Sequence, residues 1–182
     1  MNAKGKKKRT VLLGVTGSIA AYKACELVRL FVKNGDDVHV VMTRNACEFV
    51  TPLTFQTLSR NPVACRQFDE PADWRPGHIS LAEAADIVVV APATANIIAK
   101  MAHGIADDML SSILLATRAP IVVAPAMNAG MYENAATQAN LETLRSRGVN
   151  VVEPASGELA CGTSGMGRLA ELSDILAFAA AL

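Results

Sequence analysis

Residues 10–23 have the sequence TVLLGVTGSIAAYK, in which a short apolar run meets a glycine turn and then a helical pattern. Thr10–Val15 is the kind of β-branched run that forms a buried strand. Gly17 allows a tight turn, and Ser18 is of the type that caps the start of a helix. A second β-branched run, Asp37–Met42, follows that helix. Strand, turn, helix and strand in this order predict the first unit of a parallel sheet.

The same alternation continues along the chain. It predicts an α/β fold: a single Rossmann-like (flavodoxin-like) domain whose parallel sheet is covered by helices on both faces. Residues 51–77 contain four prolines and little periodicity, so we expect short helices and a loop there rather than another strand. Further strands are predicted over Asp86–Ala91, Pro120–Ala124 and Gly148–Val152, and further helices over Ala95–Ala102, Asp108–Ala116, Asn134–Arg147 and from Ser173 onward.

Length and charge limit the possible classes of protein. A chain of 182 residues is enough for one core, and no run reaches the roughly 18 to 20 apolar residues of a membrane helix. Five of the 17 basic residues lie within residues 1–9, which contain no acid, so residues 10–182 carry 12 basic and 17 acidic side chains. We therefore expect a flexible basic tail at 1–9 and an acidic domain over 10–182, and such a domain is poorly suited to nucleic acid.

Cysteine usage points to a reducing compartment. The four cysteines are widely spaced and form no CxxC pair, which argues against a metal site and against a disulfide framework. The basic start lacks the apolar stretch of an export signal. A cytoplasmic location is the expectation.

Candidate binding groups follow the predicted strands. The turn at Gly17 and Ser18 could bind a phosphate through helix amides or could be an ordinary strand-to-helix turn. Thr43 and Asn45 follow the second strand and could add donors beside it. The pentapeptide VVAPA occurs at 89–93 and again at 122–126, and each copy is followed by small polar residues. Ligands of open parallel sheets bind at such strand ends.

Three further residues could carry chemistry, and each has a structural alternative. Asn128 could bind a carboxylate through its amide NH2 group or simply cap a helix. His78 could act as a base or be a surface residue or helix cap. Residues 157–167 contain four glycines, so Cys161 and Arg168 sit on a stretch that suits a mobile lid over about 156–169, or on a disordered loop with an incidental thiol.

Four motifs in one order resemble the flavin-dependent cysteine decarboxylases, in particular those that act on 4'-phosphopantothenoylcysteine (PPC) in coenzyme A biosynthesis. The resemblance covers residues 10 to about 175. The motifs that carry it are Gly17-Ser18-Ile-Ala, Gly77-His78-Ile-Ser, Pro92-Ala-Thr-Ala-Asn96 with Pro125-Ala-Met-Asn128, and Ala160-Cys161-Gly with Gly167-Arg168.

The resemblance implies an FMN site and an active site on particular residues. His78 would be the base or orienting group, Asn128 would hold the substrate carboxylate, and Cys161 would protonate the product. Ala160, Arg168 and Leu169 would be further substrate contacts. FMN would contact the following residues: Gly17, Ser18, Ile19, Thr43, Asn45, Thr94, Ala95, Asn96, Ile97 and Ala126.

The implied reaction is decarboxylation of PPC to 4'-phosphopantetheine through a thioaldehyde and an enethiol, because oxidation of the thiol carbon creates an electron sink for the departing carboxylate. The resemblance also implies a homotrimer or dodecamer, and a fused or separate phosphopantothenate–cysteine ligase. No metal, membrane or nucleic acid is expected. A peptidyl-cysteine decarboxylase and a non-catalytic regulatory relative are the alternatives, although the latter would be expected to lose Cys161 or Asn128.

Overall fold

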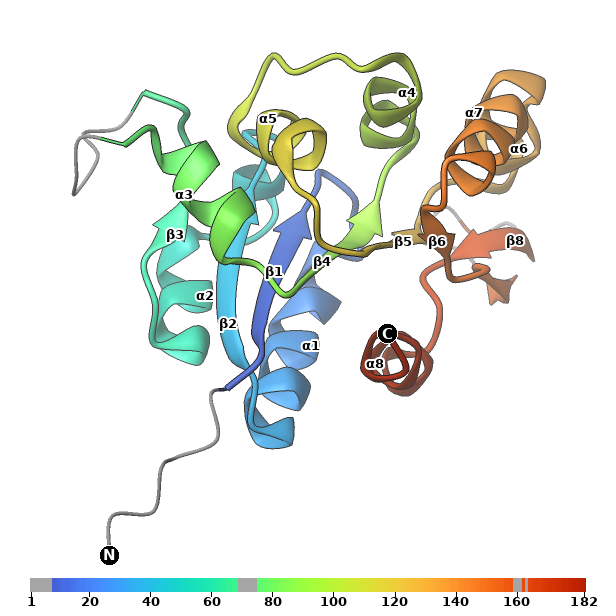
Figure 1. Cartoon of the computed structure of the whole chain (residues 1–182). Coiled ribbons are helices and arrows are strands. Elements are labelled where there is room, and N and C mark those ends of the chain that lie inside the picture. The colour runs from blue at the N-terminus through green and yellow to red at the C-terminus, as the bar shows by residue number, and fades with distance from the viewer. Residues whose placement is uncertain (1–7, 69–74, 159–161, 163) are drawn as a thin grey trace, which may run out of the picture.

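The computed structural model describes residues 8–68, 75–158, 162 and 164–182. Its centre is a parallel sheet of six strands in the order β3-β2-β1-β4-β5-β6 (Figure 1). The strands are β1 (Thr10–Val15), β2 (Asp37–Met42), β3 (Val63–Ala64), β4 (Ile87–Ala93), β5 (Ile121–Pro125) and β6 (Asn150–Val151). The predicted fold class is confirmed.

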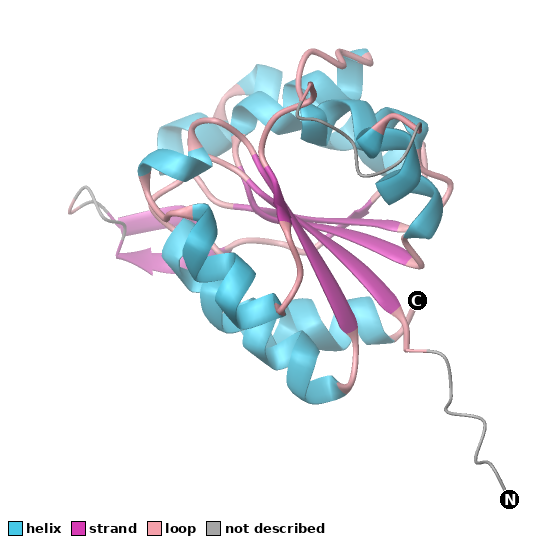
Figure 2. Ribbon diagram, turned by 90° about the vertical axis from the view of Figure 1, so that its left-hand side faces the viewer, coloured by secondary structure: helices cyan, strands magenta, loops and turns pink. Residues whose placement is uncertain are grey.

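Helices cover both faces of the sheet, as the two layers of Figure 2 show. One face packs against α1 (Ala21–Asn34), α2 (Pro52–Ser59) and α8 (Leu172–Ala180). The other face packs against α3 (Gly77–Ala84), α4 (Ala95–His103), α5 (Met109–Ala116), α6 (Ala129–Glu133) and α7 (Ala135–Ser146). A 3-10 turn, η1 (Ala46–Glu48), follows β2, and an antiparallel hairpin of β7 (Ala155–Glu158) and β8 (Ser164–Arg168) precedes α8.

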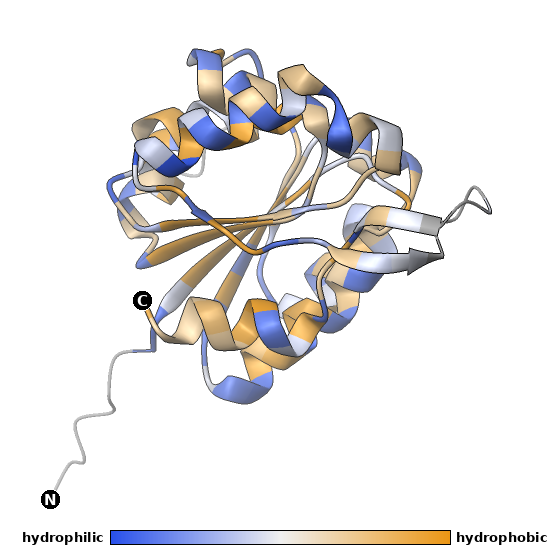
Figure 3. Ribbon diagram, turned by 90° about the vertical axis from the view of Figure 1, so that its right-hand side faces the viewer, coloured by the Kyte–Doolittle hydropathy of each residue, from blue (hydrophilic) through white to orange (hydrophobic). Residues whose placement is uncertain are grey.

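Alternation along β1 sends side chains into both layers. Val11 and Leu13 belong to the core under α1, whereas Leu12 belongs to the core under α4 and α5. This is the pattern of a strand that is buried on both faces. Figure 3 shows the consequence, with hydrophobic strands at the centre and hydrophilic residues on the outer helices. Among the helices of the described ranges, none is both long enough and apolar enough to cross a membrane.

The chain reverses its direction of travel across the sheet at β1. From β1 it moves outward to β2 and β3, and it then returns to pair β4 with the other side of β1. The carboxyl ends of β1 and β4 are therefore neighbours at the switch point, which is where ligands of such sheets bind.

Several sequence expectations need correction. The stretch 51–77 contains a strand, the two-residue β3, which is too short to show a β pattern. The predicted strand at 148–152 is reduced to β6, and α6 was not predicted. Ser18 is not the N-cap of α1, because the helix begins at Ala21 and Ala20 occupies the N-cap position. Its hydroxyl instead accepts a hydrogen bond from the Ala20 amide at 3.3 Å.

Arg9 also differs from expectation. We placed it in the basic tail, but its Nε donates to Asp36 Oδ1 at 3.1 Å and its Nη1 donates to the Ala179 carbonyl at 2.7 Å. The side chain of Asp36 is only 6% exposed, so it needs this cation. Arg9 therefore belongs to the folded domain.

Candidate functional site

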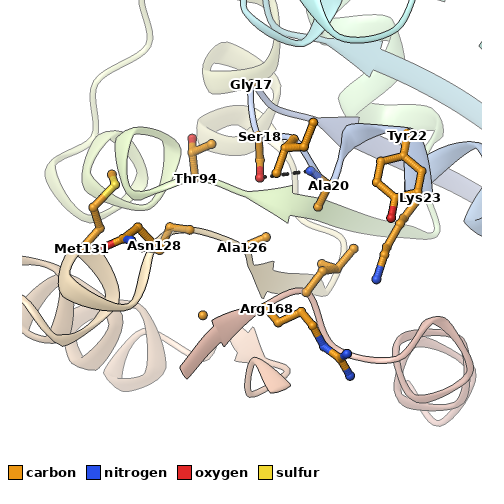
Figure 4. Close-up of a pocket in the computed structure, with 14 residues that line it drawn as sticks. Gly17, Ser18, Ala20, Tyr22, Lys23, Thr94, Ala126, Asn128, Met131 and Arg168 are labelled. Carbon is orange, nitrogen blue, oxygen red and sulfur yellow. Dashed lines mark hydrogen bonds between the residues drawn. The ribbon is translucent and has the colours of Figure 1, made fainter. Parts of the chain in front are cut away.

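A cavity of about 630 Å³ opens at the carboxyl ends of β1, β4 and β5 (Figure 4). This volume lies within the range of small-molecule and cofactor sites. Among the described residues, the lining contains two basic side chains and no acidic one, so it suits an anionic ligand. The residues that line it are Gly17, Ser18, Ile19, Ala20, Tyr22, Lys23, Thr94, Ala126, Met127, Asn128, Met131, Gly167, Arg168 and Leu169.

The amino end of α1 forms one wall of the cavity. Its N-cap residue, Ala20, makes no side-chain cap, and the first turn of the 14-residue helix contains no acidic residue. The amides there and the helix dipole favour an anion such as a phosphate. Gly17 brings the turn against Asn45, since a Cβ at Gly17 would clash with the Asn45 side chain. Asn45 therefore supports this wall, although neither it nor Thr43 lines the cavity.

Thr16 joins the ends of β1 and β4 and was missed by the sequence analysis. Its buried hydroxyl donates to the Pro92 carbonyl at 2.7 Å and accepts from the Thr94 amide at 3.0 Å. Both partners lie more than 70 residues away in sequence, so no local pattern could have indicated them. A threonine at the end of a buried strand was the only signal.

Thr94 is the N-cap of α4 and places a second helix start at the cavity. Its hydroxyl accepts from the Ile97 amide at 3.5 Å. Ala95 and Asn96 occupy the first turn of this helix, while the Ile97 side chain is buried in the core. Of these four predicted contacts, Thr94 alone lines the cavity.

Asn128 is the N-cap of α6 and places a third helix start at the cavity. Its Oδ1 accepts from the Gly130 amide at 2.9 Å. Oδ1 therefore serves the cap, and the amide NH2 group is the part that can donate to a carboxylate. Met127 and Met131 add apolar lining on either side. Both roles considered for Asn128, capping and binding, are compatible in this geometry.

Tyr132 ties α6 to the segment after β6. Its hydroxyl donates to Glu153 Oε2 at 2.9 Å, and Glu153 is also paired with Arg145. Burial, and then the Glu153 carboxylate, raise the pKa of Tyr132, so the hydroxyl remains protonated and keeps donating. This network connects α6 with the segment that leads into β7.

The hairpin of β7 and β8 forms the remaining wall, so the glycine-rich segment contains two paired strands. The Met127 amide donates to the Gly167 carbonyl at 2.9 Å. A Cβ at Gly165 would lie 2.7 Å from the Ala129 Cβ, and one at Gly167 would clash with the Met127 carbonyl. The glycines thus allow close docking as well as turning. Ala160 and Cys161 lie outside the described residues.

The structure also locates the remaining predicted residues. Leu169 is buried and lines the cavity. Arg168 lines it too, but its Nη2 pairs with Glu171 at 2.7 Å, and its buried Nε has no hydrogen-bond partner among the described residues. His78 lies in the first turn of α3 and is not part of the cavity lining. Its buried Nδ1 likewise has no partner within the described part of the chain.

Lys23 was not predicted as a site residue, although it follows Gly17 and Ser18 in the quoted motif. It is the third residue of α1, and Figure 4 shows its amine extending from that helix at the side of the cavity where Arg168 lies. The helical spacing from the glycine turn is the signal that could have found it.

Nearly the whole chain matches a protein family. Residues 2–182 match the family described as Flavoprotein. The chain belongs to the Flavoprotein family. This flavoprotein is 51% identical over 173 residues to the coenzyme A biosynthesis bifunctional protein CoaBC of Vibrio cholerae, covering 95% of the chain and 43% of that protein. It is 50% identical to the Bacillus subtilis protein of the same name, covering 94% of the chain and 42% of the relative.

This flavoprotein is also similar in structure to solved cysteine decarboxylases. A PPC decarboxylase mutant complexed with pantothenoylaminoethenethiol is 32% identical, with a TM-score of 0.84 and coverage of 94% of this chain and 96% of the other. The FMN-dependent cysteine decarboxylase SpaF is 31% identical, with a TM-score of 0.81 and 95% coverage of both chains. The flavoprotein spans less than half the length of the curated relatives it matches.

Proposed function

We propose that the chain is an FMN-dependent decarboxylase that converts PPC to 4'-phosphopantetheine in coenzyme A biosynthesis. The observation that carries the proposal is the pairing, in one cavity, of the uncapped amino end of α1 with the amide of Asn128. One end suits a phosphate and the other suits a carboxylate. Membership of the Flavoprotein family and the likeness to a PPC decarboxylase support it.

The described residues fit FMN. The turn at Gly17, Ser18 and Ile19 would hold the phosphate, supported from behind by Asn45 and Thr43. The start of α4, from Thr94 to Ile97, and Ala126 at the end of β5 would contact the rest of the cofactor. Bound FMN supplies a two-electron acceptor and donor for the substrate.

The remaining wall of the cavity fits the substrate. The NH2 group of Asn128 would orient the carboxylate that leaves as carbon dioxide, and Met127 and Met131 would provide apolar surface beside it. Lys23 and Arg168 would balance the negative charge of a phosphorylated substrate. Arg168 would do so while it remains paired with Glu171. Leu169 and Ala160 would complete the substrate contacts.

Two groups would move protons. His78, whose ring nitrogen Nδ1 is buried without a partner among the described residues, would act as the base or orienting group. Cys161 would donate the proton that completes the product. The proposed lid, at about 156–169, would bring that thiol over the cavity.

The proposed assembly is a homo-oligomer, a trimer or dodecamer. Four large apolar side chains near the starts of α1 and α2 are about half exposed or more, namely Ile19, Tyr22, Phe49 and Leu53. Their burial in a subunit contact would remove apolar area from water. We also propose a cytoplasmic location and a fused or separate phosphopantothenate–cysteine ligase as the partner activity.

The variant Asn128→Asp tests whether the Asn128 NH2 group is needed for decarboxylation. Aspartate keeps the oxygen that caps α6 but replaces the NH2 donor by negative charge, so decarboxylation of PPC should fall by about 10²–10³-fold. Asn134→Asp is the matched control, because Asn134 caps α7 in the same way, at 2.9 Å to the Ala136 amide, without lining the cavity. Carbon dioxide release and the flavin absorbance spectrum are measured for both.

Four results would contradict the proposal. A folded, colourless wild type that cannot be reconstituted with FMN would remove the cofactor assignment. Equal activity of the two variants would remove the role of Asn128. Faster turnover of a peptide ending in cysteine than of PPC would change the substrate. Full activity of Cys161→Ser, when Cys25→Ser is also fully active, would remove the proton-donor role of Cys161.

A further inference from the structure

Two cysteines outside the cavity lie in contact with each other. The Cys47 thiol donates to the Cys65 sulfur, and the two Sγ atoms are 3.9 Å apart. Both residues are half-buried thiols, packed against the core under α1 and α2. The activity proposed above uses neither of them.

The fold itself brings these residues together. Cys47 lies in η1, just after β2, and Cys65 directly follows β3, the strand that pairs with β2 in parallel. Val41 is in register with Ala64, so both chain segments emerge at the same edge of the sheet. The intervening chain includes α2, which connects the two strands.

We propose that Cys47 and Cys65 form a reversible disulfide when the protein meets a hydroperoxide. The thiolate of one cysteine attacks a peroxide oxygen, breaking the O–O bond, and becomes a sulfenic acid as one water or alcohol is released. The second thiol attacks that sulfur, forms the S–S bond and releases a water. The two thiols lose two electrons and two protons, which the peroxide takes up. A thiol reductant reverses the change.

The sulfur atoms must approach by about 1.9 Å to reach the bond length of a disulfide. Because β3 lies on the far side of β2 from β1, this closure draws η1 toward β3 and away from the turn that follows β1. Asn45, the N-cap of η1, is the residue that abuts Gly17. Oxidation should therefore loosen the α1 wall of the cavity.

The disulfide is tested on the full chain by a measurement that does not depend on catalytic activity. The reduced protein is treated with graded hydrogen peroxide, the remaining thiols are alkylated, and tryptic peptides are identified by mass spectrometry. We expect a linked Cys47–Cys65 peptide pair, two hydrogen masses lighter than the separate peptides, while Cys25 remains alkylated. The link should disappear after dithiothreitol and in Cys47→Ser and Cys65→Ser, and it should persist in Cys25→Ser.

Two results would overturn the disulfide. One is alkylation of both Cys47 and Cys65 after a treatment that oxidises Cys25. The other is a dominant link from either cysteine to Cys25 or Cys161. Each is visible in the wild type, so the outcome does not depend on how well a variant folds.

The coupling to the cavity rests on the proposed FMN site and has a separate measurement. FMN is titrated into oxidised and reduced wild type and followed by flavin fluorescence. We expect the oxidised form to bind at least about fivefold more weakly, with no such difference in Cys47→Ser. Equal affinities in the wild type would overturn the coupling and leave the peptide result standing. Failure of FMN to bind the reduced form would instead count against the proposed function.

Discussion

Gly167 holds the hairpin against the segment that carries Asn128. Its φ of 132° is unfavourable for other residues, and any side chain would meet the Met127 carbonyl. The amide of Met127 donates to the carbonyl of this same glycine. One residue therefore fixes the distance between two walls of the cavity.

Gly167→Ala should destabilise the protein by about 2–3 kcal/mol, because a strained backbone and a backbone clash act together. Gly104→Ala is the control. It also has positive φ, 69°, but open space around it, so we expect a loss of only about 1 kcal/mol. Urea unfolding of both variants measures the difference. Equal losses would mean that the hairpin can shift to make room.

Local sequence explains only part of the site at the residue level. The motif around Gly17 and the strand-end position of Asn128 predicted residues that do line the cavity. Thr16 could not be predicted, since its partners belong to β4. The separation of His78 and Asn45 from the cavity lining also depends on tertiary packing, which motif spacing does not contain.

At the scale of elements, a charge cluster connects α4 with the start of α5. Lys100 Nζ donates to Asp107 at 2.6 Å and to Asp108 at 2.8 Å. Partial burial opposes the charge of Asp108, but hydrogen bonds from Lys100 and Ser111 outweigh it and lower the pKa of Asp108 below 3.8. Burial likewise opposes the charge of Lys100, yet its two partners raise the pKa above 10.5.

Asp108→Asn removes the charge and keeps an oxygen that can cap α5. We expect a loss of about 1 kcal/mol at pH 7, discounted for the partial exposure of the pair. Because the folded pKa of Asp108 is depressed, its contribution is present above pH 3.8 and is lost as pH falls through the folded value. The raised pKa of Lys100 sets the upper limit, since that contribution is lost above pH 10.5.

Thermal unfolding as a function of pH measures this effect. The wild type and Asp108→Asn should differ at neutral pH and converge in acid. The exposed Asp107→Asn serves as the comparison and should lose less. A difference between wild type and Asp108→Asn that persists unchanged at pH 2 would show that the cost is one of packing and not of charge.

Long helices and strands could be predicted from the sequence more accurately than short ones. Long amphipathic helices and the buried strands β1, β2, β4 and β5 were predicted because many residues share one period. β3 has two residues and α6 has five, which is too few to establish a period, and the strand predicted over 148–152 keeps only the two residues of β6. The hairpin was predicted as a loop because its glycines signal flexibility locally, whereas here they allow contact with Met127 and Ala129.

The exposed apolar side chains near the starts of α1 and α2 make the proposed assembly of the whole molecule testable. Leu53 is 69% exposed at the start of α2, so Leu53→Glu should change the free energy of unfolding by less than about 0.5 kcal/mol. If this surface forms the proposed subunit contact, sedimentation should show a shift from oligomer toward monomer.

Leu182→Glu is the matched control for Leu53→Glu. Leu182 is also more than half exposed, but it follows α8, away from the cavity. The control should sediment as the wild type does. A monomeric wild type, or equal assembly of wild type and Leu53→Glu, would contradict the assignment of this surface.

The alternation of strands and helices was sufficient to predict the doubly covered sheet, because burial on both faces imposes its pattern on every long element. The position of the cavity follows from the topology, since the chain reverses at β1. What the sequence could not supply is the contact between segments remote along the chain, such as Arg9 with Asp36.

The anchoring of Arg9 also determines where additions to the chain are tolerated. Its hydrogen bond to the Ala179 carbonyl holds the first strand and the last helix together at the edge where the parallel strands begin, opposite the cavity. Any polypeptide joined after Leu182 would leave from that opposite edge. A fused catalytic module could therefore be tethered there without obstructing the mouth of the cavity.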